Sequence, residues 1–297
     1  MNDPAWSEIA AGQAPSGAFL SLVQLTSGPV TDENAFVTAL VLERLATREP
    51  SPGRGDVCER ALDFLERCER AAPRGGFAFY PIGAQPRWLR EPLPADVDDT
   101  ALCSLALYRG GRWSQNRLRH QVVEVLDRYR LAAKPGGAEW FQPGVYPTWL
   151  SDKLLRNPID VCANVNVATL LEASGLGEGH SRGIVHMVEA ALDWVANRRE
   201  RMQAIMPYYC HPAELGHALQ RAVSAGVSGA DELLARFGAQ GWWQGSEDRA
   251  APICCSLGAR VVWSSPVLQA ARAWTRQLPC CCLTPGLPRK SRLRRMR

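Results

Sequence analysis

Segments with a helical spacing of apolar residues recur along the whole chain, and they are of two alternating kinds. The first kind has one apolar stripe and a charged back, as in Val57, Ala61 and Cys68, and it recurs over residues 118–129 and 184–195. Such a stripe is typical of a helix that packs one face against a core. The second kind is apolar almost all round, which indicates a buried helix. It covers residues 35–45, 100–108, 161–171, 213–223 and 267–274.

Polar clusters precede the buried segments, for example at residues 31–34 and 96–99. Asp, Asn, Ser and Thr at these places can cap a helix by accepting hydrogen bonds from its first free N–H groups. Loops rich in Gly, Pro and aromatic residues separate the two kinds of segment, at residues 75–81, 136–143 and 241–245. The unit of organisation is therefore an outer helix, an aromatic loop and an inner helix.

This unit repeats about five times with a period of roughly 50 to 65 residues, and strand signals are nearly absent. We therefore predict an all-α fold in which the helical hairpins close into a single double-layered α/α barrel. The helix starts and aromatic loops would gather at one end of that barrel. An open solenoid is the alternative, but the uneven repeat favours the closed barrel over it. Residues 1–276 would form the barrel domain, and residues 277–297 a disordered tail rich in Cys and basic residues.

Composition and charge narrow the function classes. The 297 residues are 46% hydrophobic and include ten Trp, enough for a sizeable core. The net charge is +4, but six of the 34 Lys and Arg lie in the last nine residues, which leaves 28 basic against 30 acidic residues elsewhere. A near-neutral body gives no charge argument for nucleic acid. The basic tail is a candidate for peripheral contact with an anionic membrane surface.

Other sequence signals point to a cytoplasmic protein with reduced thiols. An acidic residue near the start, Asp3, stands where a secretion signal needs positive charge, and no apolar run is long enough to span a bilayer. Ten cysteines without an export signal indicate free thiols rather than disulfides. No phosphate loop, His-Glu-x-x-His or Gly-x-Ser-x-Gly motif supports nucleotide or hydrolase chemistry.

The chemistry is concentrated at Asp96, Asp98 and Asp99, directly before a buried helical segment. One aspartate can cap the helix, but three carboxyl groups so close repel one another when ionised, and burial adds to that penalty. A carboxyl group in such a place has a raised pKa and stays protonated near neutral pH. The cluster is therefore a candidate proton donor, and simple helix capping is the alternative.

Residues 96–101, Asp-Val-Asp-Asp-Thr-Ala, resemble the Asp-x-Asp-Asp-Thr-Ala motif of class II terpene cyclases such as squalene-hopene cyclase. The helical hairpins also resemble the α/α barrel of the terpenoid cyclase and protein prenyltransferase superfamily. The resemblance implies an enzyme in which Asp98 protonates a terminal alkene or epoxide and so starts cyclisation or isomerisation of a polyprenyl chain. It also implies that Asp96 and Asp99 keep Asp98 protonated and hold its carboxyl group in the right orientation.

The same resemblance implies a hydrophobic isoprenoid substrate and no cofactor for the protonation, with Mg²⁺ needed only if the substrate carries a diphosphate. Squalene-type cyclases combine two barrels, whereas this chain has length for one, which favours a shorter substrate. Nothing in the sequence fixes an oligomeric state.

A cyclisation cavity must stabilise carbocations without offering a nucleophile, and aromatic faces do so by cation–π attraction. Each ring has ordinary core packing as its alternative role. The candidate rings are Trp140, Phe141, Tyr146, Trp149, Tyr208, Tyr209, Trp242 and Trp243, with Phe77, Phe79 and Tyr80. Asn164 and Asn166 would position a polar substrate end or tie helices together, and His211 or His217 would return a proton to the aspartates.

Two other functions remain open at this stage. Asp160 and Cys162, with His211 or His217, are similar to the zinc ligands of protein prenyltransferase β subunits, and these side chains are legitimate zinc ligands. A zinc-dependent prenyltransferase is therefore one alternative, although Asp160 could equally cap a helix and Cys162 fill a core. The other is a non-catalytic barrel that binds an isoprenoid or a protein partner.

Overall fold

The computed structural model describes residues 4–25, 27–46, 53–89, 91–154, 157–196, 198–209, 211–242, 253–256 and 262–274. Trp243 and the tail predicted at residues 277–297 lie outside these ranges. None of the described helices is long and apolar enough to cross a membrane.

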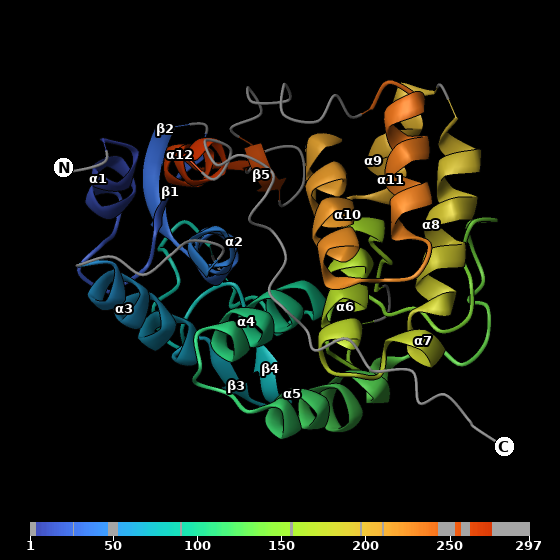
Figure 1. Cartoon of the computed structure of the whole chain (residues 1–297), viewed down its shortest axis with the longest axis horizontal. Coiled ribbons are helices and arrows are strands. Elements are labelled where there is room, and N and C mark those ends of the chain that lie inside the picture. Colours follow the sequence, from blue (N-terminus) through green and yellow to red (C-terminus); the bar gives the residue numbers. More distant parts are fainter. Residues whose placement is uncertain are drawn as a thin grey trace, which may run out of the picture.

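The five buried segments form helices within a few residues of the predicted bounds. They are α2 (Ala35–Ala46), α4 (Val97–Arg109), α6 (Val161–Ala173), α10 (Ala213–Ala225) and α12 (Pro266–Trp274). These helices contact one another in the order α12, α2, α4, α6, α10 (Figure 1). The two ends of this series are joined by Glu214 of α10, whose carboxylate accepts hydrogen bonds from Arg272 of α12 at 2.8 and 3.0 Å. The prediction of a mainly helical protein is confirmed.

A second set of helices covers the first. Helix α1 contacts α12, α3 contacts α2 and α4, α5 contacts α4, α8 contacts α6, and α11 contacts α10. Their bounds are α1 Pro4–Ala11, α3 Arg54–Glu66, α5 Gln115–Gln121, α8 Arg182–Val195 and α11 Ala230–Ala239. The predicted helix 118–129 begins as α5 and continues as a π turn (Val122–Leu126) and a 3₁₀ turn (Asp127–Tyr129). Short helical turns at Gly177–His180 (α7), Arg199–Arg201 and Met202–Ile205 (α9) complete the helical part.

The prediction of an all-α fold holds only in the coarser form of a mainly helical one, because two antiparallel sheets are also present. One has the strand order β2-β1-β6-β5 and the other pairs β3 with β4. The strands are β1 (Leu20–Leu25), β2 (Gly28–Glu33), β3 (Glu69–Ala71), β4 (Arg74–Phe77), β5 (Ile253–Ser256) and β6 (Val262–Ser264). In the polar cluster at residues 31–34, the first three residues form the end of β2, and Asn34 is the cap of α2. The closed α/α barrel is a finer prediction than the mainly helical class, and it stays a prediction.

Side-chain caps start the inner helices where the sequence predicted them. The carboxyl group of Asp160 accepts from the N–H of Ala163 at 3.0 Å, and the amide oxygen of Asn34 accepts from Val37 at 2.8 Å. The Ser265 hydroxyl accepts from Leu268 at 3.1 Å. Each cap satisfies an N–H group that has no partner within its own helix. Polar residues are thereby held at the starts of otherwise apolar helices.

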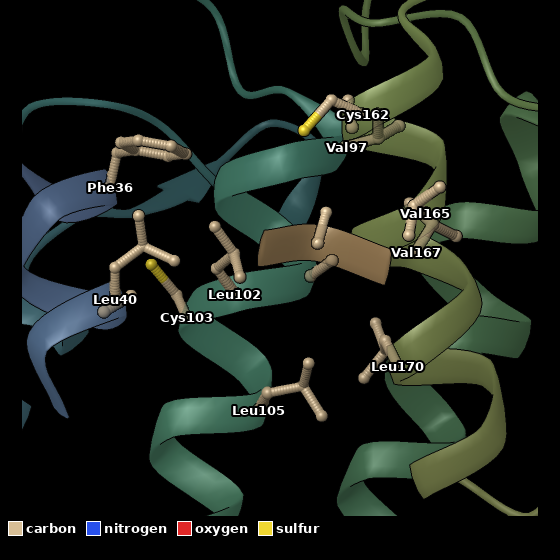
Figure 2. Packing of buried hydrophobic residues seen from close by; sticks show 14 of the residues in the cluster. Phe36, Leu40, Val97, Leu102, Cys103, Leu105, Cys162, Val165, Val167 and Leu170 are labelled. Carbon is tan, nitrogen blue, oxygen red and sulfur yellow. The ribbon is translucent and has the colours of Figure 1, made fainter. Parts of the chain in front are cut away.

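Apolar side chains fill the contacts between α2, α4 and α6 (Figure 2). Phe36 and Leu40 of α2 lie toward α4, and Leu105 of α4 and Leu170 of α6 point into the space between their helices. Cys103 and Cys162 are buried here as free thiols, and Cys162 thus has the core position given above as its alternative to zinc binding. This packing holds the starts of α4 and α6 at a fixed distance from each other.

Candidate active site

Asp96 fixes the start of α4 against two loops. Its carboxyl group accepts a hydrogen bond from the N–H of Asp99 at 2.7 Å, as an N-cap does. Its own N–H donates to the carbonyl of Phe77 at 3.0 Å, and it also forms a β-bridge with Trp149. The first turn of α4, which carries Asp98 and Asp99, is therefore rigidly placed.

Asp98 is a buried carboxyl group that two neutral donors contact. Asn166 of α6 donates from Nδ2 to one carboxyl oxygen at 2.7 Å, and the Tyr209 hydroxyl donates to the other. Burial raises the pKa of Asp98, while the hydrogen bonds and the charge of Arg221 oppose that rise. The donors that would stabilise its carboxylate are already in place.

Asp99 and Asp96 form a pair of acids. Asp99 is only 1% exposed, and among the described residues no N–H or hydroxyl group donates to its oxygens. Burial and the nearby Asp96 carboxyl raise the pKa of Asp99 well above its usual range. Burial raises the pKa of Asp96 to about 7, and a side-chain hydrogen bond with Asp99 counteracts part of the rise. Burial and their mutual repulsion therefore make both carboxyl groups harder to ionise than a free aspartic acid.

A buried arginine orients the amide that contacts Asp98. Arg221 of α10 donates to Oδ1 of Asn166 from Nη2 at 2.7 Å and from Nε at 3.2 Å. Because Oδ1 faces the guanidinium, the NH₂ group of Asn166 must face Asp98. Another nitrogen of Arg221, Nη1, lies 3.9 Å from Glu43 of α2. Three inner helices thus contribute to the position of one hydrogen bond on Asp98.

The three aspartates line one pocket whose other walls are mainly apolar and aromatic. The pocket has an empty volume of about 510 Å³ when the solvent-filled space at its mouth is included. The centre of a water molecule can occupy about 60 Å³ of this volume. This is room for a few water molecules. The residues that line the pocket are Phe36, Phe79, Leu93, Asp96, Asp98, Asp99, Thr148, Trp149, Ala163, Tyr208, Tyr209 and Trp263.

The rings of the pocket contact one another in a row that starts at the acid. Phe36 lies between Tyr209 and Phe79, with ring centroids 5.8 and 6.4 Å away. Phe79 in turn meets the edge of Trp263 at 5.0 Å. Aromatic faces beside a carboxylic acid form a site that can hold a cation but offers no strong nucleophile.

A second aromatic pair completes the wall. The Trp149 indole N–H donates to the Tyr208 hydroxyl at 2.9 Å, and the two rings meet edge to face at 5.4 Å. These contacts use the polar atoms of both rings and leave their carbon faces for the pocket.

Of the predicted substrate-binding residues, the structure brings five to the aspartates, and the other candidates that it describes do not line this pocket. The five are Phe79, Trp149, Asn166, Tyr208 and Tyr209. Trp140 and Phe141 pack on each other at 4.5 Å and do not line this pocket. The Tyr146 hydroxyl donates to Asp127 at 3.1 Å, and the Trp242 indole donates to the carbonyl of Ala196 at 3.2 Å. Loops rich in rings thus serve several packing sites, and only some of them reach the acids.

Two predicted polar residues bind the protein itself. Asn164 ties the backbone of Tyr146 to α6, because it accepts from the Tyr146 N–H and donates to the carbonyls of Tyr146 and Asp160, all at 2.9 Å. His211 accepts from the N–H of Ala213 at 3.1 Å at the start of α10. Neither lines the pocket.

The side chains proposed as zinc ligands do not form a metal site. Both oxygens of Asp160 already accept backbone hydrogen bonds, from Ala163 at 3.0 Å and from Tyr208 at 3.2 Å. Burial raises the pKa of Cys162 well above its usual range, which disfavours the thiolate that zinc requires. Within the described part of the chain, no three His, Cys, Asp or Glu residues, His217 included, are grouped to hold a metal ion. The residues therefore do not fit zinc.

Sequence reasoning missed Arg221, Thr148 and the aromatic residues Phe36 and Trp263. Phe36 and Arg221 lie on inner helices whose pattern shows that they are buried but not which neighbour they face. Trp263 enters the site because β6 pairs with β1, and its partner Val23 is distant in the chain. The residue types of β1 gave no signal for this, because Ser21 is buried in the strand while Leu22 is exposed.

Comparison with known proteins gives only distant likenesses. No protein-family model and no curated protein matches the sequence. The type II terpene cyclase MstE from Scytonema has a similar structure, with a TM-score of 0.47 and 15% identity over 91% of this chain and 94% of that one.

A variant of that cyclase in complex with geranylgeranyl dihydroxybenzoate gives a TM-score of 0.46 and 13% identity, over 91% of this chain and 93% of that one. A protein from Actinoplanes gives a TM-score of 0.44 and 14% identity, over 91% of this chain and 96% of that one. TM-scores below 0.5 do not establish a common fold.

Proposed function

We propose that the chain is a class II terpene cyclase-like enzyme in which Asp98 protonates a carbon–carbon double bond or epoxide of an isoprenoid. The observation that carries this proposal is a buried carboxylic acid in an apolar, ring-lined pocket, with two hydrogen-bond donors on its oxygens. An alkene is a very weak base, so its protonation needs an acid that is neutral, dry and supported as it becomes charged. In support of this proposal, Asp98 is buried, its pKa is raised by that burial, and Asn166 and Tyr209 donate to its oxygens.

With an alkene, the proton moves from the Asp98 hydroxyl to the terminal double bond. The π electron pair of the alkene forms the new C–H bond, and the O–H pair remains on Asp98 as the carboxylate. Tyr209 and Asn166 donate to that carboxylate as it forms. The resulting carbocation is attacked by the next double bond, which forms a C–C bond. Loss of a proton from a neighbouring carbon ends the reaction, and reprotonation of Asp98 leaves a net isomerisation.

The size of the pocket limits what it can enclose. Room for a few waters accommodates the end of a prenyl chain, but not a whole polyprenyl substrate. We therefore propose that the terminal prenyl unit enters beside Asp98 and that the rest of the chain extends through the open mouth. This makes the enzyme specific for the reacting end and tolerant of the length behind it.

We also propose that the inner helices close as an α/α barrel around this site. The order of helix contacts and the Glu214–Arg272 pair between α10 and α12 support closure. The predicted single-barrel domain of residues 1–276 would then enclose the acid without a second domain.

The test is Asp98→Asn, which keeps the shape of the side chain and removes its acidic proton. Purified wild type and variant are incubated with farnesol, geranylgeraniol and squalene, and with their terminal epoxides. Wild type should form cyclised products, and the variant should form none at an unchanged melting temperature. Asp160→Asn is the matched control, since Asp160 is also buried at an inner helix start but caps α6 and does not line the pocket. Equal turnover by Asp98→Asn and wild type would refute the mechanism.

A non-catalytic isoprenoid-binding barrel is the second candidate, and the capping role of Asp96 favours it. If the aspartates only cap the helix, Asp98→Asn changes stability and leaves the affinity for prenyl alcohols intact, with no product from either protein. Calorimetric binding beside the product analysis separates the two functions.

A further inference from the structure

A second buried carboxyl group, Asp32, lies behind the aromatic wall of the pocket. It stands near the end of β2 and is 4% exposed. Its Oδ2 accepts from the Trp263 indole N–H and from Asn34 Nδ2, both at 2.9 Å. Its Oδ1 accepts from the Tyr80 hydroxyl at 3.0 Å. Three neutral donors therefore surround one buried acid that is not itself part of the pocket lining.

These donors favour the ionised form of Asp32. Burial raises its pKa, and the hydrogen bonds from Asn34, Trp263 and Tyr80 counteract the rise. Each donor points a positive hydrogen at a carboxyl oxygen, which stabilises the carboxylate more than the neutral acid. In its ionised form, Asp32 places a negative charge against the N–H edge of the indole.

The same indole forms part of the pocket that contains Asp98. Trp263 is 2% exposed, and its ring meets Phe79 at 5.0 Å at the far end of the row of rings that starts at Tyr209. A carboxylate that accepts the indole N–H polarises the ring and makes its face more negative. A more negative face attracts a cation more strongly, and indole is already the best of the aromatic side chains for this.

We propose that Asp32 is a positioning residue that orients and polarises Trp263, so that this ring stabilises the positive charge of a ligand in the pocket. The acid and the polarised indole then lie at opposite ends of the row of rings. A cation formed near Asp98 would be drawn along the wall toward Trp263. The proposal rests on the proposed function for its biological role, but its physical content is binding of a cation and needs no turnover.

The experiment measures binding of an alkyl trimethylammonium ion and of its neutral tert-butyl isostere by isothermal titration calorimetry. The ratio of the two affinities isolates the charge, because both ligands bury the same apolar volume. Asp32→Asn should lower the affinity for the ammonium ion by about tenfold relative to the affinity for the neutral isostere. Tyr80→Phe, which removes another donor to Asp32 and leaves the indole in place, should leave the ratio nearly unchanged.

Trp263→Phe and the double variant decide whether Asp32 acts through the indole. Trp263→Phe keeps a ring but removes the N–H, and it should lower the ratio as Asp32→Asn does. Adding Asp32→Asn to Trp263→Phe should then have no further effect. Additive losses, or an unchanged ratio in Asp32→Asn, would overturn the proposal, as would a wild type that binds the ion no better than the isostere.

The affinity ratio of the Asp32 variants does not depend on whether Asp98 acts as an acid. If Asp98→Asn turns over substrate like wild type but Asp32→Asn lowers the cation ratio, the proposed function fails and the role of Asp32 stands. If Asp98→Asn abolishes turnover but Asp32→Asn leaves the ratio unchanged, the proposed function stands and the role of Asp32 fails. Should Asp32→Asn fail to fold, Trp263→Phe alone must still lower the ratio.

Discussion

Tyr209→Phe removes the hydroxyl that donates to Asp98 and leaves the ring beside Phe36 in place. A hydrogen bond to a charged group contributes about 1.5 to 3 kcal/mol. Because that bond stabilises the carboxylate, its loss raises the pKa of Asp98 further. The acid becomes weaker by the same free energy, so kcat should fall about tenfold to a hundredfold.

The pKa change can be measured without substrate, by infrared difference spectroscopy of the protonated carboxyl C=O band during a pH titration. Tyr208→Phe is the matched control, since Tyr208 lines the same pocket but its hydroxyl pairs with Trp149 rather than with Asp98. The band that disappears in Asp98→Asn should titrate at higher pH in Tyr209→Phe and be unchanged in Tyr208→Phe. A downward shift, or equal shifts in both variants, would refute the reasoning.

Three further predictions concern stability. Burial raises the pKa of Asp160 to about 7 in the folded state, whereas unfolded Asp titrates near 3.9, so stability should fall as pH rises between these values. Asp160→Asn should make melting temperatures at pH 5 and pH 8 more nearly equal. Thr148→Val should stabilise by about 1 kcal/mol in urea unfolding, because the buried hydroxyl has no partner among the described residues. Asn164→Ala should cost about 2 to 4 kcal/mol in the same assay, since three buried hydrogen bonds are lost.

The helices that carry the acids could be predicted because two local signals agree there. Asp96 and Asp160 are N-caps, and each precedes an apolar run long enough for a buried helix. A raised pKa for the clustered carboxyl groups also followed from their spacing, since like charges and burial act in the same direction. These features depend on residues close together in the chain.

The other half of the site depends on contacts between distant residues. Asn166 was a candidate only as an amide in an apolar run, and its bond to Asp98 requires the packing of α4 on α6. The indole of Trp263 reaches Asp32 only because β6 joins β1 and β2 in one sheet. Periodicity shows that such side chains are buried, but it does not show which neighbour they meet.

The most direct test of Asp98 as an acid is the source of the proton in the product. Wild-type protein is incubated in D₂O with the alkene or epoxide that it converts, and the product is analysed by mass spectrometry and NMR. An alkene should gain one deuterium at the carbon that is protonated, while an epoxide should cyclise without gaining one on carbon. Asp98→Asn should form no product from either. Cyclised alkene that lacks deuterium, or undiminished product from Asp98→Asn, would contradict the account.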